Sequence, residues 1–188
     1  MYYKDIEVCS DETISNLWQL INNAKTDDWW RISTKVEWRI SISPDLFASD
    51  IHTKSIIDEF VTPDRCYIQR LEPNSCYNWH TDYARDTSLT MCLNVYDKSF
   101  TIFGQPAQGY HIRDMHPLYY KKNTMYLIDG TMPHCGLNFS NDTRYLVSMS
   151  LTNPMTFIKA LGFLKAKFSN SSVFKTHIPG PEHETSRY

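Results

Sequence analysis

The N-terminal third of the chain contains two segments in which apolar residues recur every three or four positions, the spacing of an amphipathic helix. In the first segment Ser10 is placed as a helix N-cap, and the apolar positions that follow are Ile14, Leu17, Trp18 and Ile21. This helix should end near Asn22 and Asn23. In the second segment Ser49-Asp50 predicts the cap of a helix that runs to about Phe60 and is stopped by Pro63.

The rest of the chain up to Leu151 is dominated by patterns typical of strands. From Trp29 to Ile42 apolar and polar residues alternate, which predicts one strand. After Pro63, short apolar runs are separated by turn sequences such as Glu-Pro-Asn and Asp-Gly. These runs predict strands at 66–71, 76–80, 89–96, 100–103, 125–128 and 145–151. Many short strands of this kind indicate a β-sandwich or barrel.

One further helix pattern follows the last predicted strand. Asn153-Pro154 predicts its cap and first position, and an apolar stripe continues at Phe157, Ile158, Leu161, Leu164 and Phe168. We therefore expect a single domain over residues 1–188. It would consist of N-terminal helices and a strand (1–63), a β core (64–152), a helix packed against the sheet (153–168) and a polar tail (169–188).

Composition narrows the class of protein. A chain of 188 residues can bury one core, and 41% hydrophobic with 21% charged residues excludes a disordered or collagen-like chain. The five cysteines contain no Cys-x-x-Cys pair, which favours reduced thiols in a cytoplasmic protein over a zinc knuckle or a disulfide framework. No apolar run is long enough for a leader or a membrane span, so we expect no membrane partner. The sequence does not indicate an oligomeric state.

His80-Thr81-Asp82 is the first candidate for metal chemistry. The triplet lies where a predicted strand passes into a loop, and alternation along an extended chain places side chains 80 and 82 on the same side. His134 follows Asp129-Gly130, where a turn can direct its imidazole inward. Two imidazoles and one carboxylate form the facial triad that binds Fe(II) and leaves positions open for oxygen chemistry. The competing interpretation is a coincidental set of structural polar residues.

Arg144 is the candidate for binding an anion. It lies on the strand predicted after His134, and we expect a hairpin to bring the two residues together. Its planar guanidinium can pair bidentately with a carboxylate, and burying it without an anion would be costly. Ser148 shares the face of Arg144 and can donate a hydrogen bond to the same carboxylate. The alternating residues Tyr145, Val147 and Met149 should face the other layer.

Residues 66–151 resemble the Fe(II)/2-oxoglutarate-dependent dioxygenases, particularly their small prolyl-hydroxylase-like branch. The stretch from Arg70 to Asp82, Arg-Leu-Glu-Pro-Asn-Ser-Cys-Tyr-Asn-Trp-His-Thr-Asp, is similar to the first metal-binding strand of that branch. Residues 89–94, Leu-Thr-Met-Cys-Leu-Asn, resemble the strand after it. Pro133-His134 and Arg144-Tyr145 resemble its closing pair. The resemblance covers roughly the second half of the chain.

The resemblance implies a mainly β fold with flanking helices, the double-stranded β-helix, a jelly-roll and cupin-like sandwich with helices against one sheet. It also implies that His80, Asp82 and His134 hold catalytic Fe(II). The cosubstrate 2-oxoglutarate would chelate the iron through its keto-acid end while Arg144 and Ser148 hold its other carboxylate. O2 would take the last open position, and decarboxylation to succinate and CO2 would be coupled to hydroxylation of a substrate.

Further residues gain expected roles from the same resemblance. Tyr77 matches a tyrosine near the metal, and Asn94 ends the strand that lines the cosubstrate pocket, so both are expected to bind the cofactor. Arg85, in the loop after the metal-binding triplet, is placed to meet a substrate anion such as an amino-acid carboxylate, or else forms a surface salt bridge. We expect the four tryptophans nearest these elements to pack in the core: Trp29, Trp30, Trp38 and Trp79.

The chain departs from the family pattern in two places. Leu71 and Cys92 stand where relatives often carry a tyrosine that binds the cosubstrate carboxylate, and the usual Gly-Gly-x-Thr stretch is absent. Three residues are candidates to replace that tyrosine: Tyr67, Gln69 and Tyr126.

The sequence therefore favours an oxygenase that hydroxylates a small amino-acid-like or peptidyl substrate. Oxidation of a nucleobase or nucleotide by the same chemistry is a second hypothesis. The net charge of −2 provides no general basic field, so a nucleic-acid partner is not expected, although a local patch stays open. A third hypothesis is a cupin-like protein that binds metal or ligand without turnover, since a fold alone does not establish activity.

Overall fold

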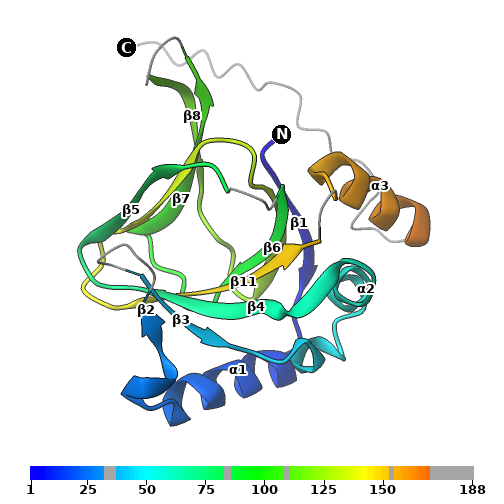
Figure 1. The fold of residues 1–188 in the computed structure, drawn as a ribbon, viewed down its shortest axis with the longest axis horizontal. Helices are drawn as coiled ribbons and strands as arrows, with labels where there is room; N and C mark the ends of the chain where they lie inside the picture. The colour runs from blue at the N-terminus through cyan, green and yellow to red at the C-terminus, as the bar shows by residue number, and fades with distance from the viewer. Residues whose placement is uncertain (32–36, 83–85, 108–110, 153–154, 170–188) are drawn as a thin grey trace.

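The computed structural model describes residues 1–31, 37–82, 86–107, 111–152 and 155–169, and their strands form two antiparallel sheets that face each other (Figure 1). The larger sheet has the order β1-β9-β6-β11-β4-β3-β2 and the smaller β5-β10-β7-β8. The larger comprises β1 (Tyr3–Val8), β9 (Thr124–Asp129), β6 (Thr87–Cys92), β11 (Arg144–Leu151), β4 (Val61–Leu71), β3 (Glu37–Ser41) and β2 (Trp30–Arg31). The smaller comprises β5 (Ser75–His80), β10 (His134–Asn138), β7 (Ser99–Pro106) and β8 (Ile112–Leu118). This is the mainly β architecture that the sequence predicts.

The helices lie on the side of the larger sheet that faces away from the smaller one (Figure 1). They are α1 (Asp11–Asn23), α2 (Ile51–Phe60) and α3 (Phe157–Lys167), with short 3-10 turns η1 (Thr26–Asp28) and η2 (Pro44–Phe47). Ser10 caps α1 as predicted, since its Oγ accepts the backbone N–H of Thr13 at 3.2 Å. Among the described residues, no helix has the length and apolar character needed to cross a bilayer.

The hydrophobic core lies mostly between these helices and the outer face of the larger sheet. Alternation along β4 and β11 sends Ile68, Val147 and Met149 to this side, where they are fully buried against residues such as Leu17 and Leu161. The apolar cluster between the two sheets is much smaller and consists of Cys92, Phe103, Leu118, Tyr120, Tyr126 and Ile128. The stability of the fold therefore comes mainly from the helix side, and the space between the sheets is left for a pocket.

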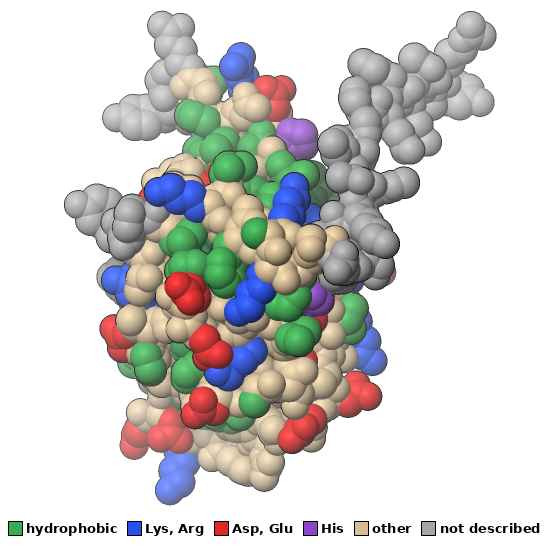
Figure 2. All heavy atoms as spheres, turned by 90° about the vertical axis from the view of Figure 1, so that its right-hand side faces the viewer, with side chains coloured by type: hydrophobic (Ala, Val, Ile, Leu, Met, Phe, Trp, Pro, Cys, Tyr) green, Lys and Arg blue, Asp and Glu red, His purple; other side chains and the backbone are tan. Residues whose placement is uncertain are grey.

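On the face shown in Figure 2, the described Lys and Arg side chains are interspersed with Asp and Glu. This face of the molecule thus presents no single-sign field of the kind that binds a polyanion by charge alone.

A buried carboxylate joins the first two helices. Asp50 is 2% exposed, and its side chain accepts hydrogen bonds from the backbone N–H of Ser10 and the hydroxyl of Thr13, each at 2.7 Å. Asp50 occupies the predicted N-cap position of α2 but makes no capping hydrogen bond there. Instead Glu7 accepts from the backbone N–H groups of His52 and Thr53 at the start of this helix. The cap is supplied by a distant strand, which no local pattern could reveal.

The single strand predicted from Trp29 to Ile42 is wrong. β2 and β3 are two antiparallel strands, with Trp30 opposite Arg39 and Arg31 opposite Trp38, so the chain reverses between them. Residues 32–36 lie outside the described residues. Apolar and polar residues alternate within each of the two strands, and alternation alone does not show where a chain reverses direction.

The expectation that all four tryptophans pack in the core is wrong for two of them. Trp29 is 7% exposed and Trp38 packs partly buried against the core, but Trp30 and Trp79 are 44% and 39% exposed.

Three strands were not predicted, and the reason differs among them. β1 and β8 are edge strands, where one neighbour is enough and a polar sequence is tolerated. β10 carries glycine and asparagine in its five residues, which hides its strand character. β4 also begins earlier than predicted, so that Pro63 lies within it. Its register with β11 shifts there, and an unpaired bulge accepts a residue without an N–H.

Helix α3 starts later than predicted. Its N-cap is Thr156, whose Oγ1 accepts from the backbone N–H of Lys159 at 3.4 Å, while Asn153-Pro154 lies outside the described residues. The described part ends just after this helix, and the predicted tail from residue 170 onward is not part of it.

We expect Asp50→Ala to destabilise the protein by about 2 to 3 kcal/mol, because it leaves buried donors on Ser10 and Thr13 without an acceptor. Urea unfolding followed by circular dichroism measures the change. Asp58→Ala is the matched control, since Asp58 pairs with Lys54 on the surface of α2 and its loss should cost less than about 1 kcal/mol. Equal midpoints for the two variants would contradict a structural role for Asp50.

Candidate metal centre and anion pocket

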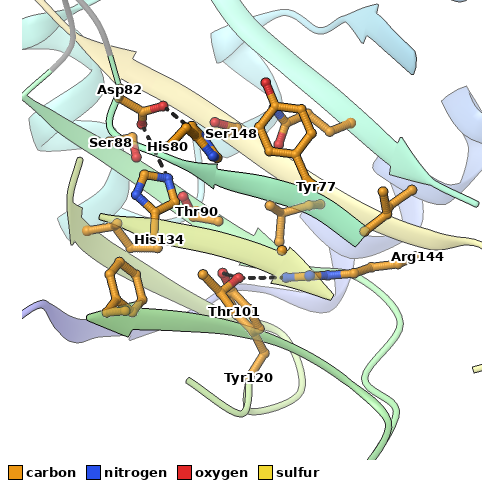
Figure 3. Close-up of a pocket in the computed structure, with 16 residues that line it drawn as sticks. Tyr77, His80, Asp82, Ser88, Thr90, Thr101, Tyr120, His134, Arg144 and Ser148 are labelled. Carbon is orange, nitrogen blue, oxygen red and sulfur yellow. Dashed lines mark hydrogen bonds and ion pairs between the residues drawn. The ribbon is translucent and has the colours of Figure 1, made fainter. Parts of the chain in front are cut away.

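Three side chains converge at one end of the space between the sheets: His80 from the end of β5, Asp82 two residues later, and His134 from the start of β10 (Figure 3). Nε2 of His80 lies 3.7 Å from Oδ1 of Asp82, and Nε2 of His134 lies 3.9 Å from Oδ2 of the same carboxylate. One ligand atom from each residue lies within 4.8 Å of the other two. The structure thus brings together the three residues singled out in the sequence.

Local pairing explains this convergence. His80 and His134 are directly opposite each other on the antiparallel strands β5 and β10, so their side chains share a face. The backbone N–H of Asp82 donates to the carbonyl of Gly130 at 2.8 Å, and the N–H of Gly130 donates to the carbonyl of Asp86 at 2.9 Å. The Asp-Gly turn after β9 therefore holds the backbone of Asp82 and of Asp86 in place.

The hydrogen bonds of the two imidazoles fix their tautomers. Nδ1 of His80 lies 2.7 Å from the carbonyl oxygen of Asn78, and Nδ1 of His134 lies 2.8 Å from that of Met132. A carbonyl oxygen only accepts, so each Nδ1 carries a hydrogen, and in the neutral imidazole Nε2 then presents a lone pair. Two lone pairs and a carboxylate face one another, an arrangement that a divalent cation relieves. Two nitrogens and one carboxylate oxygen fit non-haem Fe(II).

A buried arginine lies at the other end of the pocket. Arg144 is 2% exposed, and in the described part of the chain its hydrogen-bond partners are all uncharged. Nη1 donates to the carbonyl of Phe100 at 3.1 Å, Nη2 donates to Oγ1 of Thr101 at 3.0 Å, and Nε has no hydrogen-bond partner among the described residues. A guanidinium with an unused buried donor and no balancing acid is a strong site for a carboxylate.

Two neighbours of Arg144 were missed in the sequence. The Arg144 guanidinium lies 5.2 Å from the ring centre of Tyr120, whose hydroxyl is 3.1 Å from that of Thr101. Burial raises the pKa of Tyr120 to about 12, so the phenol stays protonated at neutral pH and keeps a hydrogen to donate. Alternation along β7 could have placed Thr101 on the inner face with Phe103. Tyr120 follows β8 in a segment without periodicity, and no local signal marks it.

One pocket connects the metal centre and Arg144. Its volume is about 690 Å³ including the open mouth, and both sheets contribute to its walls (Figure 3). Besides the triad, Arg144, Thr101 and Tyr120, the lining comprises Gln69, Leu71, Tyr77, Ser88, Thr90, Phe103, Ile128, Gly136, Leu146 and Ser148.

The route by which His134 and Arg144 meet differs from the expected hairpin. β10 belongs to the smaller sheet and β11 to the larger, so the two residues face each other across the pocket rather than along one ladder. The connection between the strands crosses from one sheet to the other. Ser148 lies on the same face of β11 as Arg144 and lines the pocket.

The other predicted site residues have mixed placements. Tyr77 lines the pocket, with its ring centre 4.4 Å from that of His80 in an edge-on arrangement. Asn94 is not among the lining residues. Its Oδ1 accepts from the backbone N–H of Tyr145 at 2.7 Å and its amide donates to the carbonyl of Thr143, so it clamps the start of β11. Arg85 lies outside the described residues.

Of the three candidates to replace the missing tyrosine, only Gln69 lines the pocket. The ring of Tyr67 is covered by the guanidinium of Arg39 at 4.2 Å. The hydroxyl of Tyr126 accepts from the backbone N–H of Lys121 at 3.0 Å. Tyr120, which the sequence did not suggest, is the tyrosine beside Arg144.

No protein-family model matches the sequence, and no curated protein matches it. Solved structures, in contrast, do match the fold of this chain. A prolyl-4-hydroxylase from Pseudomonas putida has a TM-score of 0.59 and 13% identity over 81% of this chain and 93% of its own. HygX from Streptomyces hygroscopicus, with nickel and 2-oxoglutarate bound, has a TM-score of 0.60 and 9% identity over 82% and 84%. An oxidoreductase of the 2OG-Fe(II) oxygenase family from Burkholderia pseudomallei has a TM-score of 0.53 and 13% identity over 74% and 78%.

At these identities the likeness establishes the fold. The chain is a double-stranded β-helix, as the resemblance implied; one of these neighbours belongs to the 2OG-Fe(II) oxygenase family and another holds nickel and 2-oxoglutarate.

We expect Asp82→Ala to weaken the binding of Ni(II), an oxygen-stable substitute for Fe(II), by more than about 100-fold, because it removes the only charged ligand of the triad. Isothermal titration calorimetry measures the affinity. His116→Ala is the control, since His116 lies on the edge strand β8 outside the triad. Unchanged nickel affinity in Asp82→Ala would rule out the triad as the metal site.

Proposed function

We propose that the protein is an Fe(II)- and 2-oxoglutarate-dependent oxygenase that hydroxylates a small amino-acid-like or peptidyl substrate. In this reaction a substrate C–H, 2-oxoglutarate and O2 become an alcohol, succinate and CO2. The observation that carries the proposal is the buried guanidinium of Arg144, with uncharged partners, in the pocket that also holds the His80, Asp82 and His134 cluster.

The charge of Arg144 favours a diacid over a monoacid. A guanidinium removed from water loses solvation that neutral partners restore only in part, so an anion that reaches it is bound strongly. A ligand that also reaches the metal centre must carry an acidic group at each end. A short dicarboxylate with a second donor beside one carboxylate meets both requirements, and 2-oxoglutarate has this form.

Separate groups of residues would hold the iron and the far carboxylate of 2-oxoglutarate. His80, Asp82 and His134 would hold the iron through two Nε2 atoms and a carboxylate oxygen. Arg144 would pair with the far carboxylate. The hydroxyls of Thr101 and Tyr120 lie beside it and share one hydrogen bond with each other, which leaves one hydroxyl hydrogen as a further donor, while Ser148 lines the same pocket. Bound iron and 2-oxoglutarate supply the activation of O2 that C–H oxidation needs.

Apolar side chains complete the pocket. Phe103, Ile128 and Leu146 are among its lining residues. They exclude water from the interior, which strengthens the pairing of Arg144 with an anion and limits access of solvent to the reacting centre.

Anaerobic addition of Fe(II) and 2-oxoglutarate to the protein should produce a weak visible charge-transfer band, and admission of O2 should release succinate. Arg144→Gln should raise the dissociation constant of 2-oxoglutarate by about 100-fold, because bidentate charged hydrogen bonds are lost. Arg144→Lys keeps the positive charge but loses the planar guanidinium. Its dissociation constant for 2-oxoglutarate should therefore lie between those of the wild type and of Arg144→Gln. Arg113→Gln, on the exposed strand β8, is the control.

The outcomes separate the competing functions. Normal 2-oxoglutarate affinity in a folded Arg144→Gln variant would contradict the proposed anchor. Tight binding of metal and 2-oxoglutarate without succinate release under any candidate substrate would instead favour the non-catalytic, cupin-like alternative.

Gly136 provides a second test, based on space. A Cβ at this position would stand 3.5 Å from Nη1 of Arg144 and 3.8 Å from Cβ of Tyr77, which are ordinary contacts. Gly136→Ala should therefore change the 2-oxoglutarate affinity by less than about threefold, whereas the longer chain of Gly136→Leu should enter the pocket and lower it by at least about tenfold. Nickel titration of both variants checks that the metal centre is intact. Equal 2-oxoglutarate affinity in the two variants would place the cosubstrate elsewhere.

A further inference from the structure

Three hydroxyl side chains of the larger sheet line the pocket: those of Ser88 and Thr90 on β6 and of Ser148 on β11. The three residues are buried, at 4%, 4% and 5% exposed. In the part of the chain that the structure describes, none of the three hydroxyls has a hydrogen-bond partner. A buried hydroxyl without a partner is costly, so three of them in one pocket point to a ligand that pairs with them.

The register of the strands places these hydroxyls on one face. Thr90 and Ser148 are directly opposite each other on β6 and β11, and Ser88 lies two residues before Thr90. Directly opposed residues of antiparallel strands share a face, and so do alternate residues of one strand. Ser88, Thr90 and Ser148 therefore form one patch on the inner side of the larger sheet, called the hydroxyl wall below.

The hydroxyl wall lies on the side of the pocket that holds the metal cluster (Figure 3). Ser88 is paired with the residue of β9 that precedes Gly130 by two positions, and the carbonyl of Gly130 accepts from the backbone N–H of Asp82. Ser148 follows Arg144 by four residues on β11, which corresponds to about 13 Å along an extended strand. The wall and the arginine proposed for the cosubstrate thus occupy different parts of the pocket.

The chemistry of the lining indicates what the wall can bind. Apart from the metal ligands, Arg144 is the only charged side chain among the described lining residues. Ile128 lies opposite Ser88 on β9, and Leu146 lies two residues before Ser148, so neutral hydroxyls alternate with apolar side chains. A peptide, in which uncharged amides alternate with hydrocarbon, matches this pattern. A polyol would place hydroxyls against apolar groups, and a free amino acid would bring two charges to an uncharged wall.

We propose that Ser88, Thr90 and Ser148 bind an uncharged amide group of the substrate beside the metal centre. The proposal rests on the function proposed above and selects one of its substrate classes, a peptidyl substrate and not a free amino acid. Each hydroxyl can donate to an amide carbonyl or accept from an amide N–H. Ser148, which the sequence suggested as a partner of the cosubstrate carboxylate, is assigned to the substrate instead, and Arg144 is left to the cosubstrate.

The test uses protein loaded with Ni(II) and saturating 2-oxoglutarate, so that Arg144 is already occupied. Three mixtures are equilibrated with it by dialysis, and mass spectrometry identifies the bound compounds and measures their affinities. The mixtures contain the N-acetyl amides of the twenty amino acids, the twenty free amino acids, and glucose, galactose, mannose and myo-inositol. At least one N-acetyl amide should bind at least about tenfold more tightly than its free amino acid or any polyol, because a zwitterion loses the solvation of both charges at a neutral wall.

Variants separate the hydroxyl wall from the other contacts of the ligand. Thr90→Val and Ser148→Ala each remove one hydroxyl and should weaken binding of that amide by about three- to tenfold, the contribution of a neutral hydrogen bond. Both should keep the 2-oxoglutarate affinity within about threefold of the wild type. Thr87→Val is the matched control, because Thr87 is a buried residue of the same strand whose hydroxyl also lacks a partner among the described residues, but it does not line the pocket. It should leave amide binding unchanged.

The stability of Thr90→Val provides a second measurement. Because the hydroxyl has no partner within the described chain, its removal should not lower the urea midpoint, whereas a lower midpoint would show that the hydroxyl serves the fold. Tighter binding of a free amino acid or a polyol, no binding from any mixture, or unchanged amide affinity in both Thr90→Val and Ser148→Ala would each overturn the proposal. A fall of more than about threefold in 2-oxoglutarate affinity would assign these hydroxyls to the cosubstrate.

Failure of this proposal can be told apart from failure of the proposed function. The charge-transfer band with Fe(II) and 2-oxoglutarate forms without substrate and reports on the binding of metal and cosubstrate. If that band forms and no amide is preferred, only the substrate class is wrong; if the band does not form, the oxygenase proposal itself fails.

Discussion

The buried positive charge of Arg144 is the constraint on which the rest of the site depends. Its guanidinium has left water, and the groups around it are carbonyls, a hydroxyl and the face of a tyrosine. Such partners stabilise a cation only in part. The pocket therefore contains a positive charge that the protein stabilises only in part, and the carboxylate of a ligand can stabilise it further. The length of the pocket and the cluster of lone pairs at its other end then decide which carboxylates are suitable.

The fold can accommodate this buried charge because most of the apolar packing that stabilises the protein lies outside the pocket. The main apolar core lies between the helices and the outer face of the larger sheet, with Ile68, Val147 and Met149 fully buried there. The inner face is consequently free to carry polar residues at alternate positions of the same strands, among them Gln69, Arg144 and Ser148. One face of β4 and β11 holds the molecule together, and the other provides its chemistry.

Much of this arrangement could be predicted from local signals. Alternation along β11 placed Arg144 and Ser148 on one face and Val147 and Met149 on the other, and a cap followed by periodic apolar residues gave α1. The predictions that failed concern contacts between residues that are far apart in the sequence. The cap of α2 comes from Glu7 on β1, and the tyrosine beside Arg144 is Tyr120, from a segment without periodicity. The hairpin expected between His134 and Arg144 is replaced by a crossing between sheets, because nothing local distinguishes a turn within one sheet from a passage to another.

Each imidazole of the metal centre is oriented by the carbonyl two residues before it, that of Asn78 for His80 and that of Met132 for His134. A hydrogen bond within three consecutive residues of each segment thus helps to set the orientation of each ring. Coordination of an ion would then require little rearrangement of the rings. The speed of metal uptake would be governed by how the ion loses water and enters the pocket, not by a slow folding of its ligands into position.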